Sequence, residues 1–239
     1  MLRPTAIDSD ILRFIIDSGY RPGDQLPTIQ EVSKELGVSV AKTREAMEIA
    51  RALGMLEIKP GRGMRVKPFD FAPAVSISSL YAIGLDEGNF AHLRDLRDGV
   101  EIQFWEAAVR CLTPEDIVEL RRLMAEASRQ LERHPVQVPI REHRAFHMML
   151  FSRLENPFVL GILEAFWDAY EAFGLHLYRD ISYHRNVWSF HEQIVDAIEA
   201  GDIEASRGLL IEHMNLLGTR SQEAGSDQPS LDQRGYFFE

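Results

Sequence analysis

Residues 26–66 read LPTIQEVSKELGVSVAKTREAMEIARALGMLEIKPGRGMRV, and this stretch decides the fold class of the protein. Residues 26–28 open one helix, and residues 36–39 form a tight turn around a glycine. The next helix is expected at 40–53. Residues 56–66 are then expected to fold back on themselves as a hairpin, because two apolar runs flank a glycine-rich tip.

A shorter helix is expected to precede this stretch and to end at residues 18–23, which include two glycines and a proline. Three short helices followed by a hairpin form a winged helix-turn-helix. That fold reads DNA by placing its third helix in the major groove. The hairpin tip at residues 60–63 carries an arginine between two glycines, which suits a contact with DNA at its edge.

Two prolines place a domain boundary near residues 67–73 and are expected to stop regular structure there. Beyond this boundary the apolar residues follow helical spacing, with almost no strand signal. We expect six or seven helices of bundle length, the clearest at residues 89–110, 113–134, 139–154, 158–178, 182–199 and 203–221. The predicted fold class is therefore mainly α. A winged helix-turn-helix at 1–70 is followed by an all-helical bundle at 71–224 and a tail at 225–239.

The charge distribution separates the two predicted domains. Residues 1–70 carry a net charge of +1 and all four lysines, whereas residues 71–239 carry −12 and all eight histidines. This division predicts different partners, with DNA phosphates binding the first domain. The single cysteine, Cys111, excludes an intramolecular disulfide. No signal peptide or apolar run of membrane-spanning length is present, so we expect a cytoplasmic protein with no membrane partner.

Several short motifs in residues 11–67 resemble the DNA-binding domain of the GntR family of bacterial transcription regulators. They are Ile11-Leu12, Gly19, Pro22-Gly23-Asp24-Gln25-Leu26-Pro27-Thr28, Leu36-Gly37-Val38-Ser39, Arg44-Glu45-Ala46, Leu53-Gly54-Met55 and Gly61-Arg62-Gly63. The helical remainder resembles the FCD effector domain of the FadR-type branch. Its motifs are Leu93-Arg94-Asp95-Leu96-Arg97 with Glu101, Phe146-His147, Glu155-Asn156-Pro157, His191-Glu192, residues 197–202 and His213.

The residues expected to contact DNA lie at two helix starts and at the hairpin tip. Thr28 with Glu31 opens a capping box, which places the positive end of the second helix dipole near the phosphates. Ser39 caps the recognition helix. Lys42 and Arg44 are long donors suited to guanine edges or phosphates. Arg62 suits the minor groove or the backbone. The predicted DNA-binding set is Thr28, Ser39, Val40, Lys42, Thr43, Arg44, Arg62 and Gly63.

Two positions depart from the pattern of the family. Gln30 and Val40 stand where its members commonly carry arginine, so the operator of better-known members does not transfer to this chain. Val40 instead suits a contact with a thymine methyl group. On the recognition helix, the apolar residues Met47, Ile49, Ala50 and Leu53 are expected to pack inward. A merely solvated charged face is the alternative to DNA binding, and the number of matching motifs argues against it.

Four histidines form a candidate metal site in the helical part. His143 and His147 lie four residues apart, so they share one helix face, and His191 and His213 come from the last two helices. Imidazole is a common ligand of zinc, nickel and iron, and bundle interiors hold such sites. A single helical histidine is more often an ordinary hydrogen-bonded residue. That simpler interpretation is kept for the others, which are His92, His134, His176 and His184.

The resemblance implies that these four positions are the metal ligands of the FCD domain, which are one aspartate and three histidines. Here His143 stands at the aspartate position, and Glu142 is about 100° away from it around the helix. An all-nitrogen site favours zinc, nickel or copper over manganese, with zinc or nickel expected first. The expected cofactor is therefore a divalent metal. The alternative is that the metal is lost and the pocket binds its ligand directly.

Effectors of this branch are mostly small carboxylates, and Arg97 is the residue expected to bind one, because a guanidinium grips a carboxylate with two hydrogen bonds. A pair between Arg97 and Glu101 along the helix is an equally supported role, and the two roles are compatible. The predicted function is a homodimeric regulator, a repressor, that binds a palindromic DNA operator. It is not predicted to be an enzyme. The alternatives are a metal-dependent helical-bundle enzyme and a regulator whose bundle only mediates dimerisation or protein contacts.

Overall fold

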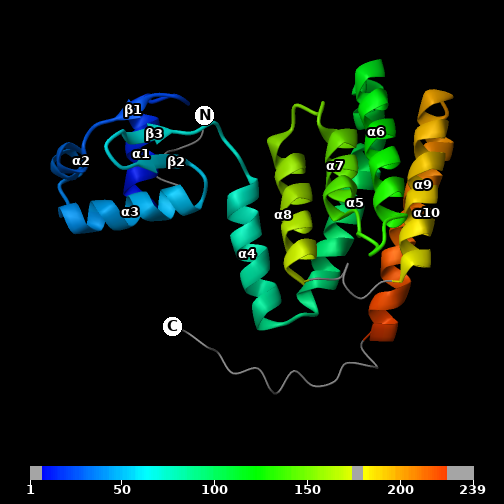
Figure 1. Ribbon diagram of the computed structural model, residues 1–239. Coiled ribbons are helices and arrows are strands. Elements are labelled where there is room, and N and C mark those ends of the chain that lie inside the picture. Colours follow the sequence, from blue (N-terminus) through cyan, green and yellow to red (C-terminus); the bar gives the residue numbers. More distant parts are fainter. Residues whose placement is uncertain (1–6, 174–179, 225–239) are drawn as a thin grey trace. The chain divides into compact units, whose positions relative to one another are not determined.

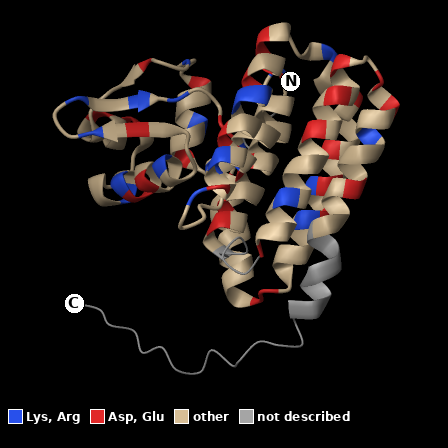
Figure 2. Ribbon diagram, turned by 45° about the vertical axis from the view of Figure 1, so that its right-hand side comes forward, with Lys and Arg blue, Asp and Glu red and all other residues tan. Residues whose placement is uncertain are grey.

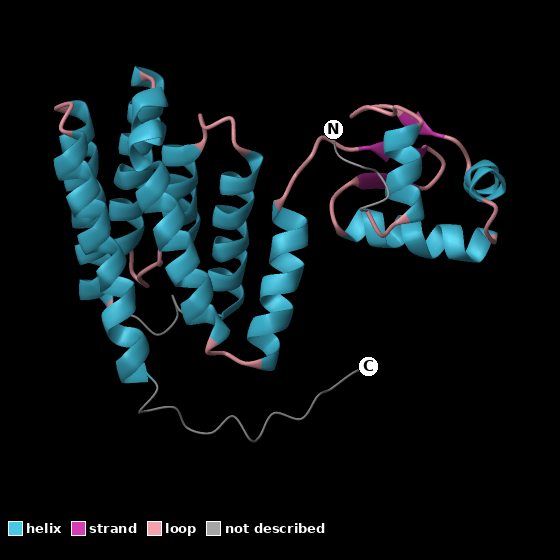
Figure 3. Cartoon of the chain, turned by 180° about the vertical axis from the view of Figure 1, so that it is seen from behind, coloured by secondary structure: helices cyan, strands magenta, loops and turns pink. Residues whose placement is uncertain are grey.

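The computed structural model describes residues 7–173 and 180–224, and its course is shown in Figure 1. The predicted tail at 225–239 lies outside these residues, as does the end of the helix predicted at 158–178. The chain divides into two units. The first comprises the chain up to Phe90 together with Leu154–Phe173, and the second comprises Ala91–Arg153 and the chain after Phe173. The mainly α fold class is confirmed, and the strands of the described residues all lie before residue 67 (Figure 3).

The winged helix-turn-helix is present in the first unit. Its elements are α1 (Asp10–Asp17), β1 (Gln25–Leu26), α2 (Ile29–Leu36), α3 (Val40–Ala52), β2 (Leu56–Lys59) and β3 (Gly63–Val66). The sheet is antiparallel with the order β1-β3-β2. The sequence did not indicate β1, because two residues are too short to show the alternation of a strand. Gln25 nevertheless pairs with Arg65 and ties the hairpin to the chain before α2.

The core of this domain is built from one face of each helix. Ile11 and Phe14 of α1, Val32 of α2 and Met47 of α3 are all buried. The expectation that Ile49 also packs inward was wrong, since its side chain is 56% exposed. Two positions along an α-helix rotate a side chain by about 200°, so a helix that buries residue 47 turns residue 49 outward.

The turn between α2 and α3 depends on Gly37, which has a left-handed backbone with φ of 65°. Its N–H donates to carbonyls of the last turn of α2, and the Ser33 hydroxyl donates to the Val38 carbonyl at 2.6 Å. A residue with a β-carbon is strained in this conformation. Gly37 therefore sets the angle at which the recognition helix leaves the turn.

A helix that the sequence analysis missed, α4 (Ala72–Leu85), follows the winged domain. Its apolar and serine residues surround the helix evenly, so no amphipathic period marks it. Pro73 occupies its first turn, where a proline is tolerated, and begins a helix rather than ending regular structure. The helix packs on α8 (Pro157–Phe173), where the Ser76 hydroxyl donates to Asp168 at 2.7 Å. Gly161 of α8 permits this approach, because a β-carbon there would meet Phe71 at 2.6 Å.

The second unit is entirely helical in its described residues. It contains α5 (Asn89–Cys111, mostly in this unit), α6 (Pro114–Leu131), α7 (Ile140–Phe151), α9 (Ile181–Glu199) and α10 (Ile203–Ala224). Along the bundle, α7 packs on α6, α6 on α9, and α9 on α10. Trp105 of α5 contacts Phe151 of α7 and donates its indole N–H to Ser206 of α10 at 3.0 Å. The helix α5 is therefore held against both α7 and α10.

Hydropathy gives one further result for this fold. Among the described residues, no helix combines the length and the apolar character that crossing a bilayer requires.

The start of α6 is locked by a buried acidic residue. The Asp116 carboxylate accepts the backbone N–H of Thr113 at 2.9 Å, which completes a capping box. It also accepts two hydrogen bonds from Arg153, at 2.9 and 3.0 Å. The Arg153 guanidinium, together with the Thr113 amide, lowers the pKa of Asp116 to about 2. A lowered pKa means that the folded state prefers the ionised carboxylate.

Replacing Asp116 by Asn keeps the size of the side chain and removes its charge. We expect the free energy of unfolding to fall by about 1 kcal/mol at neutral pH. The stabilisation by wild-type Asp116 is fully present above about pH 4 and is lost as the pH falls toward 2, because the unfolded carboxyl protonates first. Urea unfolding of both proteins across this pH range measures the difference. Glu119→Gln, which breaks an exposed pair with Arg122 on the same helix, is the control and should be near neutral. Equal losses in the two variants would contradict this role of Asp116.

Candidate metal centre and nucleic-acid interface

The recognition helix begins with satisfied backbone groups and an exposed basic turn. Ser39 caps α3 by accepting the N–H of Lys42 at 3.2 Å. Thr28 caps α2 in a full capping box, in which Glu31 accepts the Thr28 N–H at 2.8 Å. The side chains of Lys42 and Arg44 are exposed, and Figure 2 shows basic residues along α3 and the hairpin. Two helix N-termini and these cations are arranged to meet an anionic partner.

Thr43 belongs to the helix rather than to the DNA-reading set. Its side chain is 1% exposed, and its hydroxyl donates to the Ser39 carbonyl at 3.0 Å. The prediction that Thr43 contacts DNA therefore needs correction, because its side chain is buried. Val40, just after the cap, is exposed and remains available for an apolar contact with a base.

The hairpin tip presents Arg62 between two glycines with left-handed backbones, Gly61 and Gly63. A β-carbon on Gly63 would lie 3.0 Å from the side chain of Gln25. The glycines let the chain turn tightly beside β1, and they leave Arg62 exposed at the tip.

An open groove of about 640 Å³ lies between the start of α2, the end of α3 and the hairpin tip. Its lining includes Thr28 and Gln30 as well as two cations that the sequence analysis did not single out, Arg51 and Lys59. Arg51 binds Glu48 at 2.7 Å and Lys59 binds Glu57 at 2.6 Å. The sequence does not single out these two cations as DNA contacts, because an acidic residue two or three positions away offsets the charge of each.

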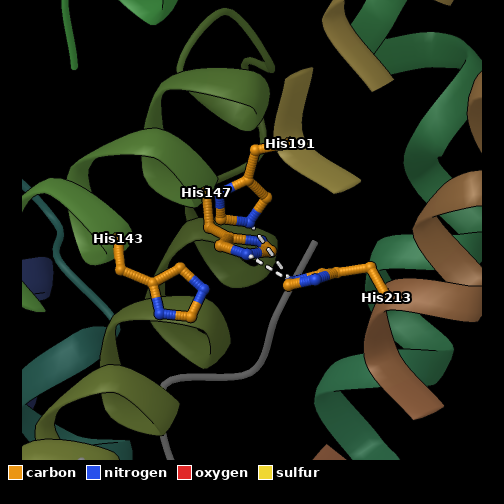
Figure 4. A group of neighbouring side chains, drawn as sticks. All are labelled: His143, His147, His191 and His213. Carbon is orange, nitrogen blue, oxygen red and sulfur yellow. Dashed lines mark hydrogen bonds between the residues drawn. The ribbon is translucent and has the colours of Figure 1, made fainter. Parts of the chain in front are cut away.

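The four predicted metal ligands converge in the second unit. His143 and His147 project from α7, His191 from α9 and His213 from α10 (Figure 4). One ring nitrogen from each lies within 4.8 Å of the others. The Nε2 atom of His213 lies 3.2 Å from Nε2 of His147 and 3.3 Å from Nε2 of His191. The sequence separations involved are large, so only helix packing brings these rings together.

The geometry and donor chemistry of the cluster fit a divalent metal. Four ligands around tetrahedral zinc, with Zn–N bonds of about 2.0–2.1 Å, lie about 3.3–3.4 Å apart. The two Nε2 distances at His213 are close to that spacing, and the nitrogen of His143 is near enough to complete the set. Imidazole nitrogen suits zinc and nickel.

The protonation state of the cluster also favours a metal. Burial lowers the pKa of all four imidazoles well below the ordinary value, and their neighbours lower it further. For His147 the second cause is the Arg97 guanidinium. Neutral imidazoles carry the lone pair that a metal ion needs, so no net loss of protons is required at neutral pH.

A layer of charged residues on α5 lies behind His147. Arg97 is 3% exposed, and its Nε donates to Glu101 at 2.6 Å. A second Arg97 nitrogen donates to Asp98 at 3.0 Å, and a third lies 3.0 Å from Nδ1 of His147. The pair between Arg97 and Glu101 is thus confirmed. Burial raises the pKa of both Glu101 and Asp98, whereas Arg97 opposes this rise.

The other histidines are not among the four converging rings. His92 and His134 are exposed, whereas His184 is buried next to Tyr183 on α9 and contributes to the lowered pKa of His143. His176 lies outside the described residues. In the sequence, Glu101 is marked by the family motif and as a partner of Arg97, and nothing marks Asp98. The place of Glu101 beside His147 follows only from the packing of α5 on α7.

Comparison with known families agrees with both parts of this description. Residues 5–66 match the family described as bacterial regulatory proteins, gntR family, and residues 92–216 match the FCD domain.

Relatives of known name align over nearly the whole chain. The Uxu operon transcriptional regulator of Escherichia coli (strain K12) is 26% identical over 231 residues, covering 94% of this chain and 88% of that protein. The HTH-type transcriptional repressor NanR of Salmonella newport (strain SL254) is 26% identical over 237 residues, covering 91% and 87%. The solved structure of Streptococcus agalactiae GntR has the same fold, with a TM-score of 0.61 at 19% identity, covering 87% of this chain and 94% of that one. Because the FCD match alone spans more than half of the chain and the gntR match covers the winged domain, the protein belongs to the GntR family of bacterial regulators and is a DNA-binding transcriptional regulator, not an enzyme.

Proposed function

We propose that this regulator is a cytoplasmic homodimer that represses transcription from a palindromic operator, and that its FCD domain senses a small carboxylate beside a bound zinc or nickel ion. One observation carries this proposal. Four neutral imidazoles converge at one buried point, directly in front of a buried arginine, in a chain that also carries a DNA-reading domain. The similarity to a protein named as a repressor supports the direction of regulation.

The proposed DNA contacts divide into those that read bases and those that hold the backbone. Arg44 and Lys42, which lie on the first turns of α3, are proposed to reach base edges in the major groove. Thr28, Ser39, Arg62 and the Gly63 backbone flank that helix and are proposed to hold phosphates or the minor groove. Val40 adds an apolar contact for a thymine methyl group.

Arg44→Ala should weaken specific operator binding by about 1–3 kcal/mol, because a bidentate contact to a base is lost. Arg62→Ala should weaken binding and also reduce the slope of affinity against salt by about one phosphate contact. Fluorescence anisotropy on an operator selected from random DNA measures both effects. Arg110→Ala, an exposed arginine paired with Glu106 on α5, is the control and should bind normally. Arg44→Ala with wild-type affinity would remove Arg44 from the reading set.

The proposed effector is a small carboxylate bound by Arg97. Guanidinium donors recognise carboxylates, and Arg97 already holds Glu101 and Asp98 in this way. Its position beside Nδ1 of His147 lets an anion bound by the arginine act on the histidine cluster through that ring. The same anisotropy titration, repeated on the metal-loaded protein with a panel of small carboxylic acids, tests this role. An operator affinity unaffected by every acid would contradict a carboxylate sensor.

The proposed metal ligands are His143, His147, His191 and His213. A zinc or nickel ion held by these four nitrogens would bind an effector oxygen by expanding its coordination beyond four, and would act there as a Lewis acid. The chain contributes the rest, namely a dry position, neutral nitrogens and fixed helices. His143 is the decisive member, because it replaces the aspartate expected from the resemblance and still lies within the ligand cluster.

His143→Ala should lower zinc affinity by more than the roughly 10–100-fold that loss of an outer partner causes, because a direct ligand is removed. Glu142→Ala, the adjacent residue outside the cluster, is the matched control and should bind zinc normally. Competition with a chelator measures both affinities. Elemental analysis of wild-type protein purified without a nickel column should find about one divalent ion per chain. A silent His143→Ala beside a damaging Glu142→Ala would reverse the ligand assignment.

The helix α4 supports the proposed homodimer. The 14 residues from Ala72 to Leu85 contain no charged side chain. One face packs on α8, whereas Ile77, Leu80, Tyr81 and Leu85 form a second, exposed apolar face. A helix that is apolar all round is normally covered on all sides. A second copy can cover this face with its own, since an uncharged patch meets itself across a twofold axis without repulsion.

Leu80→Glu should convert the dimer into a monomer, because two buried charges would face each other across the axis. Light scattering during size exclusion should give twice the 27.3 kDa chain mass for the wild type and the single mass for the variant. Val118→Glu is the control, because Val118 is 68% exposed on α6 as an isolated apolar residue. A dimeric Leu80→Glu protein would place the interface elsewhere.

A further inference from the structure

The buried carboxylate of Glu101 has one oxygen with no hydrogen bond. Glu101 lies in the middle of α5 and is fully buried. Its Oε1 accepts the Nε–H of Arg97 at 2.6 Å. Among the described residues its Oε2 has no hydrogen-bond partner, and it lies 3.4 Å from Nδ1 of His147. Leaving a buried carboxylate oxygen unpaired is costly, so this atom calls for an explanation.

The tautomer of His147 supplies that explanation. In the arrangement described, Nδ1 of His147 lies 3.0 Å from an Arg97 nitrogen, which can only donate. Nδ1 is then the acceptor, and the single ring proton of the neutral imidazole is on Nε2. That proton points into the histidine cluster, 3.2 Å from Nε2 of His213. A protonated nitrogen has no lone pair for a metal, so His147 must change tautomer before its Nε2 can act as a ligand.

We propose that Glu101 is the positioning residue of the metal centre, because its Oε2 accepts the Nδ1 proton of His147 and thereby holds the tautomer whose Nε2 binds the ion. This inference rests on the proposed metal site. In the change, the ring loses its proton from Nε2 and gains one at Nδ1, so its charge stays the same. A shift of about 0.5 Å brings Oε2 within normal hydrogen-bond distance. The Arg97 nitrogen must then turn away from His147, since two donors cannot face each other.

Charge balance points to the same residue. Four neutral imidazoles leave the full double charge of an ion in a buried site, where an aspartate ligand would have cancelled part of it. The carboxylate of Glu101 supplies negative charge directly behind one ligand. A carboxylate that accepts the second N–H of a ligating histidine also orients the ring and strengthens it as a ligand. Asp98 does not share this role, because the interactions of the described residues join it to Arg97 and not to His147.

Glu101→Gln tests the proposal because it replaces the hydrogen-bond acceptor that faces His147 with a donor. The amide oxygen must face the Arg97 donor, so the amide NH₂ faces Nδ1 of His147 and favours the tautomer that cannot bind metal. We expect zinc affinity, measured by chelator competition on the full chain, to fall by about 10–100-fold. Asp98→Asn is the matched control, because it removes another negative partner of Arg97 without touching His147. Its zinc affinity should change by less than about threefold.

Nitrogen NMR of protein labelled at its histidines gives a readout that a purely structural role of Glu101 would not move. In zinc-loaded wild type, His147 should carry its proton on Nδ1, with signals assigned from a His147→Asn variant. Folded Glu101→Gln with wild-type zinc affinity, or equal losses in Glu101→Gln and Asp98→Asn, would overturn the proposal. A protonated Nε2 in the zinc-loaded wild type would also overturn it, even if Glu101→Gln failed to fold. Wild-type protein that binds no zinc would refute the proposed metal site itself.

Discussion

The second unit depends on holding four uncharged imidazoles around one buried point. Burial lowers their pKa values and keeps them neutral, but each ring still has a second nitrogen that needs a partner or a defined environment. The helices α7, α9 and α10 supply the rings, and α5 supplies the polar residues behind His147. The contacts of Trp105 with α7 and α10 keep α5 in that place. The convergence of the four rings is therefore a property of helix packing as much as of the histidines.

The winged domain depends on helix capping and turn geometry rather than on a cluster of buried polar rings. Its core is small, and its precision comes from capped helices and one left-handed glycine in the turn. Thr43 is an example, because its hydroxyl, which the sequence suggested for a DNA contact, instead hydrogen-bonds to the Ser39 carbonyl in the first turn of α3. The exposed donors Lys42 and Arg44 then extend from a helix whose start is already fixed. A rigid start costs less entropy on binding than an adaptable one.

Two features of this chain bear on the proposed homodimer and on the proposed ligand sensing. The apolar helix α4 follows the hairpin directly and offers a face that a second copy can cover. The buried Arg97 stands between two acidic residues and a histidine, so any anion that competes for its donors must also change the histidine layer. The proposed effector and the proposed metal would thus be coupled through these shared hydrogen bonds.

The sequence by itself determined the features that depend on local periodicity and capping. Thr28 and Ser39 predicted the helix starts, the glycine-rich tip predicted the hairpin, and the four-residue spacing of His143 and His147 predicted one shared face. It missed α4, since a uniformly apolar helix has no period to detect, and it placed Ile49 inward although the helical rotation turns it out. Only the tertiary structure decided which ring nitrogens meet, and that Glu101 lies behind His147. Those contacts join residues tens of positions apart, and their geometry follows from how whole helices pack.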